Sequence, residues 1–166
     1  GTEYVYTPDS NQNYWTQLFL SLGVDVVIGT HPHVLEPVEV VSDTKGHEML
    51  VYYSLGNFVS NQDQKPRMIG GMAKMTLVKD ETGCYVKNYN LTPVITQKLF
   101  GKKAITTYKL SDYTESLASG NAIRNDSGCS DFSLSYCQTL VKQILGDDYD
   151  ESTSELNVSL HPDGLV

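Results

Sequence analysis

One stretch decides the fold, and it runs Gly23-Val24-Asp25-Val26-Val27-Ile28-Gly29-Thr30-His31-Pro32-His33. Its centre is a short β-branched run between two glycines, which is typical of a buried strand. Apolar residues at helical spacing precede it, from a helix start at Thr7-Pro8-Asp9 to a helix stop at Gly23. Because a helix leads into the strand, we predict a parallel strand in an α/β fold.

Two histidines, His31 and His33, follow this strand directly, and Pro32 stiffens the turn between them. Ligand sites in open α/β sheets form outside the C-terminal ends of the strands. Neutral imidazole is a common ligand of Zn, Fe, Mn and Ni, and two histidines in one turn can each bind one ion of a two-metal site. Many such pairs are only surface loop residues, and the spacing alone leaves both interpretations open. His47 and His161 are expected to be turn and tail residues.

The rest of the chain predicts two hairpins and a helical C-terminal part. Alternating apolar residues and turn signals indicate the hairpins, which pair residues 38–41 with 49–54 and residues 72–78 with 85–91, the latter closed by Pro93. An apolar stripe from Leu134 to Leu145, followed by Gly146, predicts a helix. Further expectations are a short helix at 111–121 and a mobile acidic segment at 147–155.

The composition narrows the possible functions. The chain has 166 residues, with 12 basic and 20 acidic side chains and a net charge of −8. Such an acidic chain has no electrostatic basis for wrapping nucleic acid, so no nucleic-acid partner is expected. No apolar run approaches the roughly 18 residues of a membrane helix, so no membrane segment is expected either.

The cysteines and the first residues raise separate points. Cys84, Cys129 and Cys137 lack metal-type spacing, and the odd number leaves at least one free thiol or an intermolecular bond. A Cys129–Cys137 disulfide and three ordinary thiols both remain open. The opening Gly1-Thr2-Glu3-Tyr4 has no initiator Met, which predicts a processed, engineered or truncated product.

Three segments in order resemble motifs of the bacterial capsule-synthesis CapA family. They are the latter part of a His-Trp-Gly-x-Glu-Tyr motif at Gly1-Thr2-Glu3-Tyr4, the segment from Gly23 to Glu39, and Val51-Tyr52-Tyr53-Ser54-Leu55-Gly56-Asn57-Phe58. This family is linked to poly-γ-glutamate capsule production and has a calcineurin-like, metallophosphoesterase-like fold. The resemblance therefore implies the C-terminal part of a layered αββα sandwich, with a mixed sheet and hairpins.

The same resemblance implies an organisation for the chain. Residues 1–110 would be the C-terminal part of the metallophosphoesterase-like domain. Residues 111–166 would be a helical extension and acidic tail packed on the same domain. In that superfamily a Gly-His-x-His element supplies metal ligands, and the matching residues here are His31 and His33.

The superfamily's other ligands come from earlier motifs that contain Asp-x-His, Gly-Asp-x-x-Asp and Asn-His, and none of these precedes His31 in this sequence. Mn, Fe or Zn is the implied cofactor of a longer protein. A two-metal centre needs more ligands than two histidines supply. We therefore expect this chain, as a fragment, to bind metal weakly or not at all and to be catalytically inactive.

Four other residues are candidates for supporting or substrate-binding roles. Glu3 and Glu39 match family motif positions and would orient a ligand imidazole, or would be a solvated acid or a cap. Asn57 would either form a left-handed turn or hydrogen-bond a phosphate or carboxylate. Arg67 would pair bidentately with an anionic substrate, or would be a plain surface side chain. Glu36 is expected to face solvent.

The resemblance implies two functions of different classes. The first is a capsule-biosynthesis protein with a metal-dependent phosphoesterase-type site. The second is a non-enzymatic accessory subunit that binds the polyanionic polymer or its synthase. Both imply the bacterial cell surface, with the capsule-synthesis machinery or an anionic polymer as partner. Self-association of this chain is expected as well, since a truncated sheet exposes an edge or an apolar face.

Overall fold

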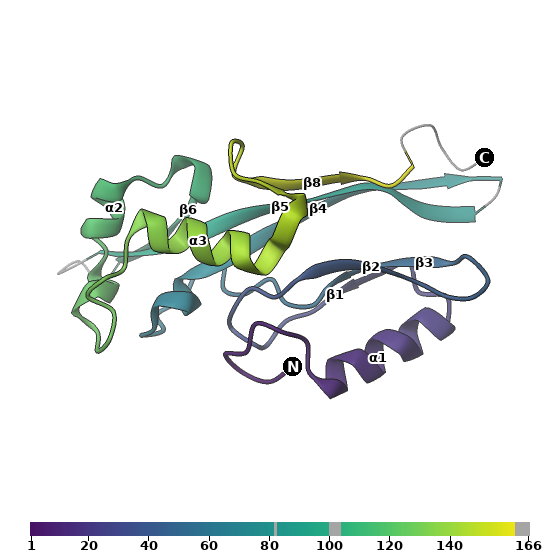
Figure 1. The fold of residues 1–166 in the computed structure, drawn as a ribbon, viewed down its shortest axis with the longest axis horizontal. Coiled ribbons are helices and arrows are strands. Elements are labelled where there is room, and N and C mark those ends of the chain that lie inside the picture. Colours follow the sequence, from purple (N-terminus) through teal and green to yellow (C-terminus); the bar gives the residue numbers. More distant parts are fainter. Residues whose placement is uncertain (82, 100–103, 162–166) are drawn as a thin grey trace.

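The computed structural model describes residues 1–81, 83–99 and 104–161. Figure 1 shows a small sheet that lies between one helix and a long, twisted hairpin, with further helices at one end of that hairpin. The described part is an α/β structure with two sheets, one of them mixed. The α/β class, the mixed sheet and the hairpins are therefore confirmed, whereas the calcineurin-like sandwich stays a prediction.

Helix α1 (Ser10–Ser21) precedes the first strand as expected. Its N-cap is Asp9, whose carboxylate accepts the Gln12 backbone N–H, while the Gln12 side chain accepts the Asp9 backbone N–H. This reciprocal capping box satisfies two donors that the first turn leaves free. Pro8 therefore precedes the helix and does not lie in its first turn. Gly23, with φ of 76°, follows the C-cap and ends the helix.

The small sheet contains β1 (Val26–Ile28), β2 (Val38–Ser42) and β3 (Glu48–Tyr52), in the order β1-β3-β2. β1 pairs with β3 in parallel, and β2 pairs with β3 in antiparallel orientation, so the predicted parallel strand and the first hairpin are confirmed. β1 is less buried than expected, since Ile28 is 51% exposed. Its position at the edge of the sheet explains this exposure, because one side of the strand has no neighbour in the described residues.

Alternate residues of β3 and its continuation face two different cores. Met49, Val51 and Tyr53 pack with Leu20 of α1. Leu50 and Tyr52 point the other way, into the larger core that the second sheet and the C-terminal helices share. This alternation follows from the two-residue period of a strand, and it makes β3 the central element that joins the layers.

The second sheet is antiparallel and is built around a long hairpin. It comprises β4 (Ile69–Asp80), β5 (Gly83–Leu99), β6 (Ala104–Lys109), β7 (Tyr149–Asp150) and β8 (Glu155–Ser159). The second predicted hairpin is confirmed, but the prediction that Pro93 closes it is wrong. β5 continues through Pro93, because its pairing with β8 ends at Leu91 and its pairing with β6 begins at Val94. Pro93 lies where one side of the strand has no partner, so its missing N–H is not needed there.

The C-terminal part supplies α2 (Glu115–Ser119), α3 (Leu134–Leu145) and the 3-10 turns η2 (Leu110–Asp112), η3 (Ala122–Asn125) and η4 (Gly146–Asp148). A further 3-10 turn, η1 (Lys65–Met68), directly precedes β4. α3 agrees with its predicted bounds and packs its apolar stripe into the larger core. The helix predicted at 111–121 is shorter, because Thr114 caps it and Gly120 ends it. The acidic segment predicted to be mobile instead contains η4, β7 and the first residue of β8.

All three cysteines are free thiols, so the Cys129–Cys137 disulfide does not form in this structure. Cys129 and Cys137 are fully buried, and Cys84 is exposed. Burial raises the pKa of the Cys137 thiol to about 12. In the described ranges, no helix has the length and apolar composition needed to span a bilayer.

A Gly29→Ala substitution tests the packing at the end of β1. A Cβ at this position would lie 2.0 Å from the Tyr53 carbonyl oxygen, a backbone atom that cannot move away alone. We expect Gly29→Ala to lower the free energy of unfolding in urea by at least about 2 kcal/mol. Gly120→Ala is the control, because its nearest heavy atom would be 3.4 Å away. Equal stabilities of the two variants would contradict the close approach.

Thiol labelling tests the burial of the cysteines. With an aromatic disulfide reagent under native conditions, one thiol per chain should react rapidly, and Cys84→Ser should remove that reaction. Cys129 and Cys137 should react only after denaturation, since a buried thiol is not accessible to the reagent. Rapid reaction of a second thiol in the native chain would contradict the packing of α3.

Candidate functional site

The histidine turn leaves the C-terminal end of β1 and is held by backbone hydrogen bonds on both sides. The Gly29 N–H donates to the Tyr52 carbonyl at 2.7 Å, which continues the pairing with β3. The Tyr4 N–H donates to the Pro32 carbonyl at 2.9 Å, so the N-terminal segment lies against the turn. The turn is therefore fixed between the small sheet and residues near the start of the chain.

His31 and His33 lie side by side, with ring centroids 6.0 Å apart and planes inclined by 48°. His31 is exposed and His33 is half-buried. Their φ angles are 97° and 60°, and Tyr4 has φ of 65°. Non-glycine residues in such conformations cost about 1–3 kcal/mol each and occur where the surrounding structure imposes them, frequently at functional sites.

Asn57 hydrogen-bonds His33 and sets the orientation of its ring. The Asn57 amide nitrogen donates to the backbone carbonyls of His33 at 3.2 Å and of Arg67 at 3.0 Å. Its oxygen therefore faces Nδ1 of His33, 3.0 Å away, and accepts a hydrogen bond from the N–H of that nitrogen. In a neutral ring with the proton on Nδ1, Nε2 keeps its lone pair, which is the arrangement that a metal ligand or a general base requires. The left-handed position belongs to Gly56, with φ of 62°, and not to Asn57.

Arg67 reaches the same place from η1, the 3-10 turn that precedes β4. Its guanidinium carbon lies 3.6 Å from the centroid of the Tyr4 ring, and the Tyr4 ring stacks on His33 at 6.3 Å with an interplanar angle of 29°. The structure thus brings His31, His33, Asn57 and Arg67 together. Tyr4 joins them as well, through a contact that no local pattern in the sequence predicts.

Glu3 and Glu39 are not joined to this group. Both are exposed, and in the part of the chain that the structure describes neither forms a hydrogen bond or ion pair with the histidines. Glu39 lies on β2 and hydrogen-bonds Tyr53, whose pKa is raised chiefly by burial. The supporting roles of the two glutamates stay predictions.

The expectation that Glu36 faces solvent is wrong, because this side chain is completely buried. Its N–H donates to the Ser54 carbonyl, and the flanking Leu35 pairs with Leu55, so the segment lies against the chain that follows β3. One carboxylate oxygen accepts the Gln12 side-chain amide at 2.5 Å, and the other is buried with no hydrogen-bond partner among the described residues. Burial raises the pKa of this carboxyl, and the Gln12 hydrogen bond opposes the rise. An acid inside the apolar run from Val34 to Val38 was the available signal.

The donor set fits a divalent metal in part. His31 and His33 supply two imidazoles on one turn, and the hydrogen bond from His33 Nδ1 to Asn57 leaves Nε2 of His33 available as a ligand. Structural and catalytic zinc sites use three or four protein ligands. Across residues 1–81, 83–99 and 104–161, no group of three or more His, Cys, Asp or Glu side chains is arranged to hold a metal ion. The described residues therefore supply one part of a coordination shell.

Comparison with known proteins agrees with the resemblance. Residues 1–62 match the family of the bacterial capsule synthesis protein PGA_cap. Over 94 residues the chain is 34% identical to the PGA biosynthesis protein CapA of Bacillus subtilis (strain 168). This match covers 57% of this chain and 22% of that protein. Over 62 residues it is 36% identical to the capsule biosynthesis protein CapA of Bacillus anthracis, and this match covers 37% of this chain and 14% of that protein. The chain thus matches less than a quarter of either relative's length, and no solved structure is significantly similar to it.

A Glu36→Gln substitution tests the buried carboxyl. Below about pH 4.5, the ordinary pKa of this group, both the folded and the unfolded chain hold the proton. As the pH rises, the unfolded chain ionises first, so the wild-type chain loses stability until the folded pKa is passed. The glutamine variant lacks this loss and should melt higher at neutral pH, by about 2–4 °C for each kcal/mol recovered.

Thermal unfolding followed by circular dichroism between pH 4 and pH 8 measures this difference. The advantage of Glu36→Gln should disappear at the acidic end of the range. Glu81→Gln, at an exposed glutamate, is the control and should change the melting temperature little at any pH. A Glu36→Gln curve that is parallel to the wild-type curve would refute the buried, uncompensated carboxyl.

Proposed function

Since residues 1–62 match the bacterial capsule synthesis protein family, we propose that the chain contributes His31 and His33 to a divalent-metal site of the phosphoesterase type. The metal would be Mn, Fe or Zn. The site would serve a capsule-biosynthesis protein at the bacterial cell surface, with poly-γ-glutamate or its synthesis machinery as partner. A calcineurin-like sandwich is the fold we propose for the complete domain.

The observation that carries this proposal is the hydrogen bond between Asn57 and His33. A metal-binding imidazole almost always donates its other N–H to an acceptor, which fixes the tautomer and the direction of the ring. Asn57 does this for His33 at 3.0 Å, and its own orientation is determined by two backbone carbonyls. Two of the three hydrogen bonds of this half-buried amide go to His33, one to its ring and one to its backbone carbonyl, which is more than a surface histidine without a function requires.

The residues of this chain have separable roles in the proposal. His31 and His33 would hold the metal, Asn57 would keep the Nε2 lone pair of His33 available, and the Tyr4 ring would cover one face of His33. A metal bound at such a site polarises a phosphoryl or acyl-phosphate oxygen, or lowers the pKa of a water molecule. The strained backbone at His31 and His33 would present the two rings in fixed directions before any ligand binds.

Metal titration tests this function in the 166-residue chain. Because the described residues supply two donors, we expect weak binding of about one equivalent of Co²⁺, followed by its visible absorption spectrum. His33→Ala and His31→Ala should each abolish the spectrum. Asn57→Ala should weaken the affinity about 10–100-fold, the usual effect of removing such a partner.

Asn88→Ala, at an exposed position on β5, is the matched control and should bind Co²⁺ like the wild type. Tight binding of two ions would contradict the expectation that this chain lacks the remaining ligands. Unchanged binding in both histidine variants would refute the metal site and leave the non-enzymatic accessory function.

A further inference from the structure

Among the described residues, one edge of the Arg67 guanidinium has no hydrogen-bond partner. Its Nη1 pairs with Asp63 at 3.0 Å, whereas its Nε is buried and bonds none of those residues. No hydrogen bond from Nη2 is found among the described residues either. The side chain is only 19% exposed, so water reaches little of it. A buried, unpaired donor on a charged group is unfavourable and calls for a specific explanation.

The free atoms have the geometry of an oxyanion receptor. Nε and Nη2 form two parallel donors on one edge of a planar group, which matches two oxygens of a carboxylate or phosphate. Asp63 already occupies the other end of the guanidinium, so this edge is the one left for a ligand.

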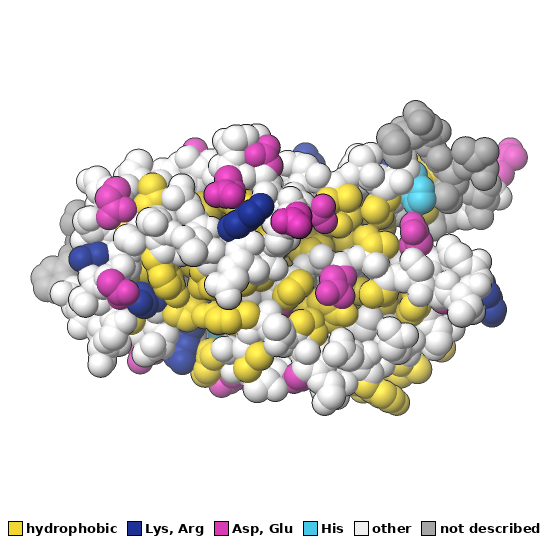
Figure 2. All heavy atoms as spheres, in the orientation of Figure 1, with side chains coloured by type: hydrophobic (Ala, Val, Ile, Leu, Met, Phe, Trp, Pro, Cys, Tyr) yellow, Lys and Arg dark blue, Asp and Glu magenta, His cyan; other side chains and the backbone are white. Residues whose placement is uncertain are grey.

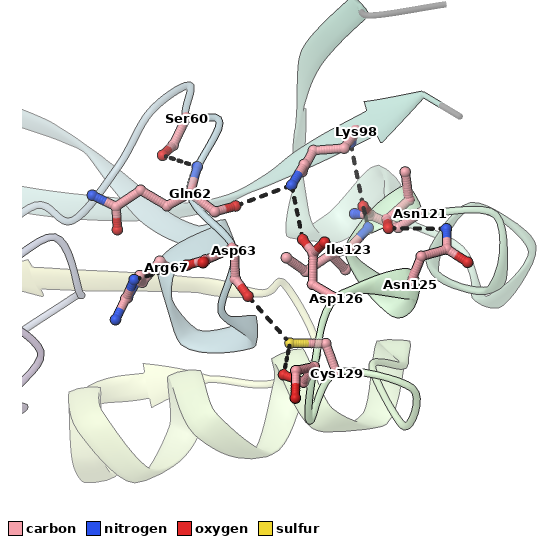
Figure 3. Close-up of polar contacts among 12 residues, drawn as sticks. Ser60, Gln62, Asp63, Arg67, Lys98, Asn121, Ile123, Asn125, Asp126 and Cys129 are labelled. Atoms are coloured by element: carbon pink, nitrogen blue, oxygen red, sulfur yellow. Dashed lines mark hydrogen bonds and ion pairs between the residues drawn. The ribbon is translucent and has the colours of Figure 1, made fainter. Parts of the chain in front are cut away.

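The segment that carries Arg67, residues 60–67, is fastened by the C-terminal half of the chain. Figure 3 shows Lys98 donating to the Gln62 carbonyl at 3.2 Å while it pairs with Asp126 at 3.0 Å, and the Cys129 thiol donating to the Asp63 carbonyl at 3.5 Å. Lys65 pairs with Asp131 at 2.7 Å, and its ammonium group lies 4.8 Å from the centre of the Tyr136 ring.

These anchors spare the Arg67 side chain itself. In Figure 3 Arg67 extends from the segment on the side away from Lys98. The guanidinium carbon lies 3.6 Å from the centroid of the Tyr4 ring, and the Asn57 side-chain amide donates to the Arg67 carbonyl. Because one face of the guanidinium already packs on Tyr4 and the Arg67 backbone is hydrogen-bonded, the side chain loses little further conformational entropy when a ligand binds.

We propose that the Nε–Nη2 edge of Arg67 binds a phosphate or carboxylate group of the substrate next to the His31–His33 pair. The inference rests on the proposed function for the identity of that substrate, but the oxyanion site stands on the geometry of Arg67 alone. A phosphoester and a γ-linked glutamate polymer share the chemistry that this edge recognises, so the two sources are separated by experiment.

Nuclear magnetic resonance of the metal-free chain observes this site directly. The sequence has two arginines, Arg67 and Arg124, so two Nε–H resonances are expected and single substitutions assign them. Titration with inorganic phosphate and, separately, with glutarate should shift the Arg67 resonance to saturation. The Arg124 resonance serves as the internal control, because its guanidinium donates to the Phe132 carbonyl and is not part of the site.

Arg67→Lys distinguishes geometry from charge. Lysine keeps the positive charge but loses the two-donor edge, so we expect an affinity for the anion about tenfold lower, measured by ³¹P line broadening or calorimetry. Lys45→Ala removes one positive charge from an exposed turn and should leave the affinity unchanged. The overall charge of −8 disfavours general anion binding, so a saturable response reports the site.

Each outcome decides something. A response to phosphate only, or to glutarate only, supports the site and names its source of oxyanion. An Arg67 resonance that neither anion moves overturns the inference and leaves a trapped water as the partner of Nε. The two proposals fail separately. Co²⁺ binding that is lost in the histidine variants supports the metal site, and a phosphate response that stays intact in the same variants supports the oxyanion site independently of the metal.

Discussion

The side-chain amide of Asn57 is the interaction on which the candidate site depends. With three hydrogen bonds it joins the histidine turn to Arg67 in η1, just before β4, although these segments are far apart in the sequence. Its backbone can approach β4 only because Gly70 has no side chain, since a Cβ there would lie 2.3 Å from the Asn57 carbonyl oxygen. Gly56, in the left-handed region, turns the chain into this position. One amide thus determines both the tautomer of His33 and the place of the Arg67 backbone.

The strained residues are maintained by the packing around them. Tyr4, His31 and His33 have positive φ angles, yet each is adjacent to a hydrogen bond or a ring contact that would be lost in a relaxed conformation. Beneath them lie fully buried side chains such as Leu35, Met68 and Ile69, which belong to the larger core. Burial of each large apolar side chain contributes about 1.5–3 kcal/mol, which is comparable to the cost of one strained residue. The core therefore imposes a fixed arrangement on the two imidazoles.

Local patterns predicted much of the fold. The parallel strand, both hairpins and α3 follow from periodicity and from glycines at their ends. The prediction that Pro93 ends the hairpin is wrong because the effect of a proline depends on which side of β5 is paired. That pairing is a property of the sheet and not of the local sequence. The burial of Glu36 depends likewise on contacts distant in sequence, namely its backbone bond to Ser54 and its side-chain bond to Gln12. The histidines were identifiable from their position after β1, whereas the contact of Tyr4 with Arg67 joins residues that no local pattern relates.

The surface charge explains why an oxyanion site in this chain has to be directional. Acidic side chains are scattered over the face seen in Figure 2, and the net charge is −8, so long-range attraction of an anion is weak. Asp63 further offsets the charge of Arg67. Selectivity therefore depends on the two donors on one edge of the guanidinium, which bind strongly only a ligand whose two oxygens match their spacing. Because the C-terminal half of the chain holds residues 60–67 through backbone carbonyls and Lys65, it can position that edge without using its donors.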